Sequence, residues 1–117
     1  MCPGWVTTGI WDAERNWPAR LGETPSPSLA SEVMRPHQVR ANDAGMRPAA
    51  VADLVPDAIV SDRFWVLPHP EFVELAARRW QRIAEGSNPD TAVDIPGFPP
   101  AKQIEGEIQA ALTATAS

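Results

Sequence analysis

Apolar residues recur at helical spacing in the second half of the chain, where the pattern is clearest. Five of them occupy one face of a helix: Val51, Leu54, Val55, Ala58 and Ile59. Pro48 suits the first position of this helix, where its missing N–H costs no hydrogen bond. Pro56 falls inside the helix, removes a backbone donor and clashes with the preceding turn, which predicts a bend or an early end there.

A second amphipathic helix is predicted from Pro70 to Gly86, with carboxylates near its start and arginines near its end, as the helix dipole favours. Its apolar face consists of Phe72, Leu75, Ala76, Trp80 and Ile83. Between the two helices, residues 64–67 (Phe-Trp-Val-Leu) have high strand propensity and are closed by Pro68. We expect a short strand there that is buried or paired.

The rest of the chain is rich in proline and predicts loops with two further helices. Residues 1–10 are expected to form the end of a strand that runs into a turn at Pro3 and Gly4. A Pro-Ser-Pro-Ser stretch at 25–28 precedes a helix that Pro36 is expected to end or kink. After a proline- and glycine-rich linker, Ile104, Ile108 and Leu112 mark a weak terminal helix.

Charge and cysteine content exclude several classes of partner and cofactor. A net charge of −5 with a pI of about 4.9 leaves no basic stripe for the phosphates of a nucleic acid. Cys2 alone forms no internal disulfide, and with His37 and His69 it matches no zinc spacing. No run is long and apolar enough to span a membrane, and no secretion signal begins the chain. We expect a cytoplasmic protein without a metal site.

The segment from Cys2 to Thr8 (Cys-Pro-Gly-Trp-Val-Thr-Thr) resembles the P-G-x-V-x-T motif that follows the sixth strand of short-chain dehydrogenases/reductases. Pro3, Gly4, Val6 and Thr8 occupy its defined positions. In that family, the backbone around the valine and the threonine hydroxyl bind the nicotinamide carboxamide and a nearby phosphate of NAD or NADP. Taken alone, the motif is more simply an ordinary Pro-Gly turn.

Later segments resemble the last helix-strand-helix unit of the same family, in the same order. They are Gly45 to Pro48, Val51 to Leu54, Asp57 to Ile59 and Asp62 to Glu71. Arg47 and Pro56 depart from the family pattern, which has a capping Ser or Thr and a helix former there. The resemblance covers residues 1–86. It implies an α/β fragment, the C-terminal part of a Rossmann-like doubly wound fold that is mostly helical, with one or two short strands and long loops.

The resemblance divides the chain into four parts. Residues 1–10 correspond to the end of the sixth strand and the Pro-Gly cofactor turn, and 11–47 to a substrate-binding loop with short helices. Residues 48–86 correspond to the final helix-strand-helix unit, and 87–117 to a flexible tail. In this family the last strand and the helix before it often form the subunit interface, which implies a homo-oligomer through residues 48–67.

Three apolar residues fall where the family's variable substrate-binding loop lies: Ile10, Trp11 and Trp17. The two tryptophans can line an apolar substrate pocket or can simply be packing residues. His69 invites an acid/base role, but its place between two prolines favours capping or turn packing.

The family's catalytic machinery has no counterpart in this sequence. Tyrosine is absent, so the Tyr-x-x-x-Lys pair is missing, and Lys102 is the only lysine. The seven glycines never form the G-x-G turn that would hold a pyrophosphate. We therefore assign no catalytic residue, and expect this chain alone not to bind NAD or NADP tightly. We also expect the missing N-terminal portion of the fold to lie upstream of Met1 and to be a partner of this chain.

Three functions stay open at this point. The chain is the C-terminal portion of an NAD(P)-dependent oxidoreductase, inactive alone; or it is a small interaction module, whose five tryptophans cover a partner; or it is an unfolded gene remnant. Clear helical circular dichroism with a cooperative melt would exclude the third.

Overall fold

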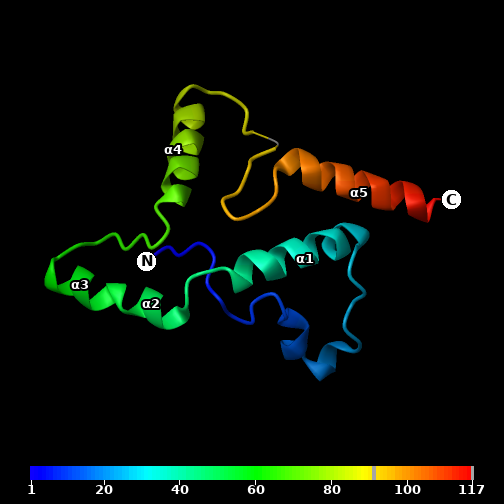
Figure 1. The fold of residues 1–117 in the computed structure, drawn as a ribbon, viewed down its shortest axis with the longest axis horizontal. Coiled ribbons are helices and arrows are strands. Elements are labelled where there is room, and N and C mark those ends of the chain that lie inside the picture. The colour runs from blue at the N-terminus through cyan, green and yellow to red at the C-terminus, as the bar shows by residue number, and fades with distance from the viewer. Residues whose placement is uncertain (91, 117) are drawn as a thin grey trace.

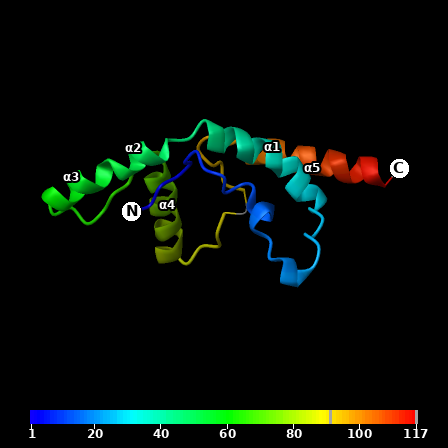
Figure 2. The same ribbon diagram turned by 90° about the horizontal axis from the view of Figure 1, so that it is seen from below.

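The computed structural model describes residues 1–90 and 92–116 (Figure 1). Two short 3₁₀ helices precede five α-helices: η1 (Ala13–Asn16), η2 (Ala19–Leu21), α1 (Leu29–Asp43), α2 (Pro48–Ala52), α3 (Leu54–Val60), α4 (Glu71–Ala84) and α5 (Ala101–Thr115). Helix α5 packs beside α1, and α3 continues from α2, while α4 stands apart from both pairs (Figures 1 and 2). The molecule measures 59 × 43 × 28 Å.

Helix α1 begins where the Pro-Ser-Pro-Ser stretch ends. Ser28 is its N-cap, and its hydroxyl accepts a hydrogen bond from the backbone N–H of Ser31 at 3.2 Å. Pro36 was predicted to end or kink this helix, and it does not end it, because α1 runs on to Asp43. Contacts with other segments instead stabilise the second half of α1, because His37 and Asn42 both form hydrogen bonds to residues outside this helix.

The interruption predicted at Pro56 is present, because α2 ends at Ala52 and α3 begins at Leu54. Proline has no N–H to bond with the carbonyl four residues earlier, which belongs to Ala52, and its ring clashes with that carbonyl. Within α3 itself, Pro56 lies in the first turn, where a missing donor costs nothing. Pro48 begins α2 as predicted.

The short strand predicted at residues 64–67 is absent. These residues have no regular structure, and they make one backbone hydrogen bond to another segment, from the N–H of Cys2 to the carbonyl of Val66 at 3.1 Å. A strand forms only as part of a ladder, and no partner strand is present among the described residues. In residues 1–10, likewise, the predicted strand end is reduced to a single parallel bridge between Val6 and Met46.

Helix α4 ends in the way its sequence predicts. Gly86 takes a φ of 67°, and the N–H groups of Gly86 and Ser87 donate to the carbonyls of Ile83 and Arg82. This pair of bonds is a Schellman motif, which favours glycine because the left-handed conformation is strained for other residues.

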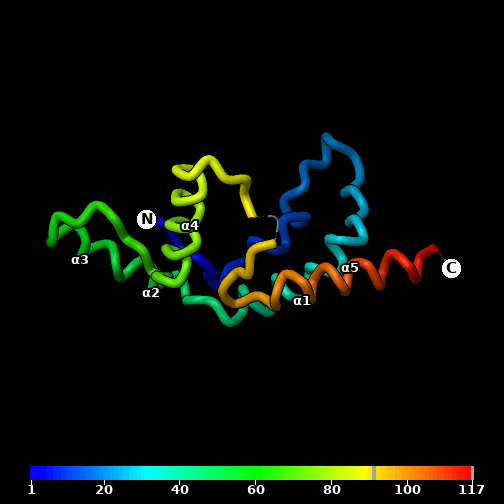
Figure 3. Tube along the Cα trace, turned by 90° about the horizontal axis from the view of Figure 1, so that it is seen from above, coloured from blue at the N-terminus to red at the C-terminus, as the bar shows by residue number. Residues whose placement is uncertain are grey.

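The range 87–117, expected to be a flexible tail with a weak helix, contains the 15-residue α5; positions 91 and 117 lie outside the described residues. After α4 the chain returns to the N-terminal residues before α5 begins (Figure 3). Met34 of α1 and Ile104 of α5 line one small cavity of about 210 Å³ together with Phe98. Ile104 is buried.

Few side chains are buried in this arrangement. Among the described residues, the buried apolar ones are Ala41, Val51, Ala58 and Ile104. The accessible surface is 8985 Å², whereas a compact monomer of this mass exposes about 6,200 Å². The helices are therefore formed, but they do not enclose a core.

Candidate functional site

The Pro-Gly segment is fixed to the turn that follows α1. The N–H of Met46 donates to the carbonyl of Trp5, and the N–H of Thr7 donates to the carbonyl of Met46, both at 3.0 Å. These two bonds form the parallel bridge at Val6. The N–H and carbonyl of Val6 itself face away from the bridge and have no partner among the described residues.

Two side chains of this segment, those of Thr7 and Trp5, attach it to other parts of the chain. The hydroxyl of Thr7 lies 3.1 and 3.0 Å from the carbonyl oxygens of Asn42 and Gly45, and the indole of Trp5 donates to the carbonyl of Pro96 at 2.7 Å. The segment also lines a groove of about 530 Å³, to which Trp5 itself contributes. The lining includes all four predicted cofactor-binding residues and one predicted substrate-binding residue: Pro3, Gly4, Val6, Thr8 and Ile10. The structure thus brings these five residues together.

Gly4 is needed where the chain passes closest to α4. A Cβ at this position would lie 2.6 Å from the ring of Phe72 and 3.1 Å from the ring of His69. The N–H of Gly4 donates to Nδ1 of His69 at 2.9 Å. His69 therefore packs in a turn, against Phe72 edge-to-face, and holds the Pro-Gly segment through a ring nitrogen that must be unprotonated to accept.

Asn42 is a site residue that sequence reasoning missed. Its side chain is buried, with 3% exposed, and its amide donates to the carbonyl of Thr8 at 2.7 Å. Nearby, a Cβ on Gly45 would lie 2.7 Å from the backbone of Trp5. The only sequence signal was a polar residue followed by glycine at the end of a helix, which is an ordinary helix terminus.

Trp11 and Trp17 do not reach this groove. The Arg35 guanidinium lies over the Trp11 ring at 5.5 Å, and the indole of Trp17 donates to the carbonyl of Gly22 at 3.1 Å. Arg35 also pairs with Glu14 at 3.1 Å. A backbone hydrogen bond and then Arg35 hold the pKa of the Glu14 carboxyl below its ordinary value. In this structure Trp11 contacts Arg35 of α1, and Trp17 makes a local hydrogen bond within the segment that contains η1 and η2.

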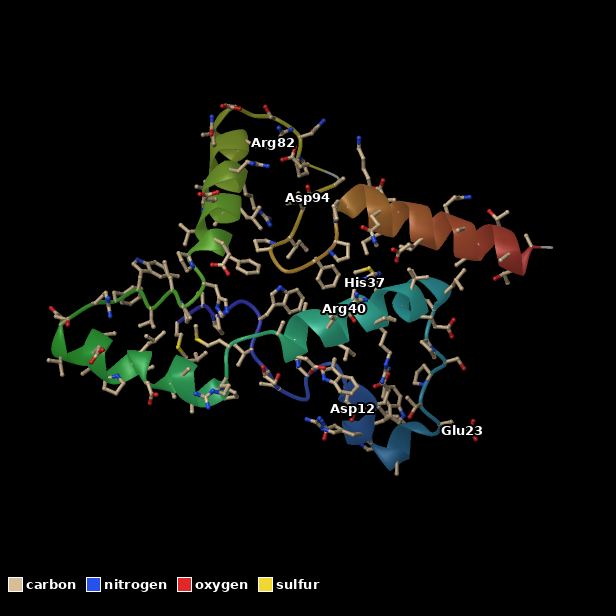
Figure 4. The ribbon with its side chains drawn as sticks, viewed as in Figure 1. Asp12, Glu23, His37, Arg40, Arg82 and Asp94 are labelled. Atoms are coloured by element: carbon tan, nitrogen blue, oxygen red, sulfur yellow. The ribbon has the colours of Figure 1, made fainter. Side chains whose placement is uncertain are left out.

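A histidine and a carboxylate meet between α1 and α5. Nε2 of His37 lies 2.6 Å from a carboxylate oxygen of Glu107, and the His37 side chain is 10% exposed (Figure 4). Gln103, and after it His37, lower the pKa of the Glu107 carboxyl by hydrogen bonding to its charged form. The second ring nitrogen of His37 is buried without a partner. This pair joins two helices.

The groove offers groups that suit one end of a nicotinamide cofactor. A carboxamide has both donor and acceptor atoms, and the free N–H and carbonyl of Val6 and the exposed hydroxyl of Thr8 complement them. Nothing comparable for a pyrophosphate is present in the described part of the chain. Those residues also hold no cluster of metal-binding side chains and no helix long and apolar enough to cross a membrane.

Comparison with known proteins gives one informative likeness. The chain is 32% identical over 96 residues to a CLA biosynthesis dehydrogenase/reductase of Lactiplantibacillus plantarum, a match that covers 80% of this chain and 34% of that protein. No protein-family model matches the chain, and no solved structure does. The chain is therefore related to a dehydrogenase/reductase, and it spans about a third of that relative's length.

Proposed function

We propose that this chain is the C-terminal portion of a short-chain dehydrogenase/reductase that uses NAD or NADP. It supplies the turn on the nicotinamide side, the substrate loop and the last helix of a Rossmann-like fold, and it is inactive alone. The observation that carries this proposal is the groove, because Pro3, Gly4, Val6 and Thr8 line it together. The relationship of this chain to a dehydrogenase/reductase, which extends over most of its length, supports the proposal.

The contact between the chain's first residues and residues 64–67 also supports this arrangement. The hydrogen bond from Cys2 to Val66 sets these two apolar segments side by side, as neighbouring strands of a sheet would be. Each still has free backbone groups that a further strand would satisfy. In the proposal, the remaining strands come from the N-terminal portion of the fold.

The residues of this chain would bind the nicotinamide end of the cofactor and orient it. Val6 would hold the carboxamide through its backbone, Thr8 would donate or accept at the same end of the ligand, and Ile10 would cover the ring with apolar surface. When bound, the nicotinamide supplies hydride transfer. The proton transfer that must accompany it has no donor here, since the sequence has no tyrosine and no groove residue replaces it.

A titration with nicotinamide mononucleotide tests the half-site directly. We expect millimolar concentrations to shift the backbone NMR signals of Val6 and Thr8, and Thr8→Ala to reduce the affinity several-fold. Thr24→Ala is the matched control, because Thr24 is also exposed but lies outside the groove. Shifts scattered over the surface, or an unchanged affinity in Thr8→Ala, would refute the assignment. Micromolar binding of NADH or NADPH would contradict the claim that the site is incomplete.

An interaction module remains the second candidate, and one observation favours it. The segment from α3 to α4 exposes a group of large apolar side chains, which we call the α3–α4 surface: Ile59, Val60, Phe64, Trp65 and Leu67. It falls within residues 48–67, where we propose that copies of the chain associate. Association without any response to nicotinamide mononucleotide would favour this candidate over the oxidoreductase.

A further inference from the structure

The chain segment between α4 and α5 is built around one side chain, that of Trp5. We call residues 94–98 the clasp. The carbonyl of Pro96 accepts from the Trp5 indole at 2.7 Å, and the ring of Phe98 stacks on the indole with centroids 5.2 Å apart and planes 9° apart. Gly97 has a φ of 81°, and a Cβ there would lie 3.1 Å from the indole. The clasp is thus shaped to the indole on three consecutive residues.

The clasp is itself attached to the two long helices. Asp94 accepts from the N–H of Ala101 at 2.8 Å, where a carboxylate is favoured by the start of α5. Phe98 also contacts the ring of His37 on α1, with centroids 6.2 Å apart. His37 in turn is bonded to Glu107 on α5. Trp5 is therefore connected to α1 and α5 through aromatic contacts and hydrogen bonds.

Trp5 and its two neighbours, Gly4 and Val6, all contribute to the lining of the groove. Because neighbouring side chains of an extended segment point to opposite sides, holding the indole in the clasp fixes the direction in which the Val6 side chain points. Thr7 anchors the same side two residues further on, through its contacts with Asn42 and Gly45. Without the clasp, the segment would keep its bridge, the bond from Gly4 to His69 and the Thr7 contacts, but the indole of Trp5 would lose its fixed position.

We propose that the clasp positions the Pro-Gly turn for its ligand, with Phe98 as a positioning residue outside the groove that acts through the Trp5 indole. This inference rests on the proposed function, since the ligand is the nicotinamide end of NAD or NADP. It assigns a role to the segment after residue 86, which the resemblance left without one. In this proposal, the clasp fixes the orientation of the turn that lines the groove.

Amide hydrogen exchange in the full chain tests the positioning. The reporters are the N–H groups of Gly4 and Thr7, which are bonded to His69 and Met46. We expect Phe98→Leu to raise their exchange about tenfold while leaving the amides of α4 unchanged. Phe98→Tyr keeps the stacked ring and should restore slow exchange. Trp80→Phe, at an exposed position on α4, is the control.

A milder variant covers the case in which Phe98→Leu disturbs folding. Trp5→Phe keeps an aromatic ring for Phe98 but removes the donor to Pro96, and we expect it to raise the same two exchange rates by a smaller factor. Circular dichroism confirms that each variant is folded. Exchange of Gly4 and Thr7 that stays at the wild-type rate in both variants would overturn the proposal.

Binding of nicotinamide mononucleotide separates this proposal from the function on which it rests. If both proposals hold, Phe98→Leu weakens the affinity for nicotinamide mononucleotide, measured from the Val6 and Thr8 signals, about tenfold. Phe98→Tyr then restores that affinity. A loss of global stability alone would not produce this pattern. If the wild type shows no shifts while exchange responds as expected, the nicotinamide assignment fails and the positioning of the turn stands. Normal binding by Phe98→Leu would overturn the positioning role.

Discussion

Gly4 has almost no space for a side chain, which makes it a sharp test at the scale of one residue. A methyl group would meet the ring of Phe72 at 2.6 Å, so we expect Gly4→Ala to destabilise the chain by about 1–3 kcal/mol through overpacking. Gly106→Ala is the control, because no atom lies within 4 Å of the added carbon. In the helix α5 this change should stabilise by about 0.5–1 kcal/mol. Urea unfolding measures both, and equal effects would contradict the close approach.

Glu107 gives the packing of α5 on α1 a dependence on pH. Hydrogen bonds from Gln103 and then His37 place its pKa below the ordinary 4.5, so its contribution is complete above that value and is lost as pH falls through the lower folded pKa. We expect Glu107→Gln to flatten the loss of stability below pH 4.5. Glu105→Gln is the matched control, because it removes the same charge from an exposed neighbouring residue. Parallel stability curves for wild type and Glu107→Gln would count against this linkage.

Candidate site residues could be predicted from the sequence only where a local motif carries them, and their ligand stays a prediction. The spacing of Pro3, Gly4, Val6 and Thr8 is contained in six residues, and the structure gathers all four at the groove. The hydrogen bonds made by Asn42, His69 and the clasp join residues that lie 34, 65 and 91 positions apart in the sequence. No local pattern reports such contacts. The sequence did indicate that His69 packs in a turn, and its bond to Gly4 agrees.

Pro36 is the main local defect among the helices, because it lies in the interior of α1. Proline there removes a hydrogen bond and clashes with the preceding turn, at a cost of about 3 kcal/mol. We expect Pro36→Ala to stabilise the chain by up to about that amount and to strengthen the helical circular dichroism. Pro48→Ala, at the first position of α2, should change stability little. A destabilised Pro36→Ala would mean that the ring of Pro36 makes contacts that outweigh its backbone cost.

Helices were predicted well and strands poorly, for a physical reason. The caps of α1 and α4, the start of α2 and the break before Pro56 depend on residues within one or two turns of each other. A strand at residues 64–67 depends on neighbours that must be supplied by distant chain. Propensity indicated a strand, but the ladder is absent from the described residues. Pro36 shows the reverse case, since contacts from outside sustain a helix that local preference would end.

The whole molecule is far more open than its length requires. The Cα radius of gyration is 18.2 Å, whereas about 13 Å is typical of a compact domain with this number of residues. The surface exceeds that of a compact monomer by roughly 2,700 Å², which is the size of a permanent interface between proteins. Both values fit a chain whose apolar faces are completed by other polypeptide.

The α3–α4 surface should therefore drive association of the isolated chain. Phe64 is 83% exposed and lies edge-to-face against Trp65. Because burying a phenylalanine contributes about 1.5–3 kcal/mol, we expect Phe64→Ser to weaken self-association at least about tenfold in sedimentation equilibrium. Leu21→Ser, which removes an exposed apolar residue outside this surface, is the control. Equal weakening by both variants would show that association is not specific to the surface.

The bond between Trp5 and Pro96 also fixes an order in time. The two residues are separated by 91 positions, so the clasp cannot close on a growing chain until residues 94–98 have left the ribosome, after the helices α1 to α4. Closing a longer loop costs little more free energy, about 0.6 kcal/mol for each doubling of its length, but it does delay closure. During synthesis the Pro-Gly turn thus leaves the ribosome well before the clasp that holds it in place.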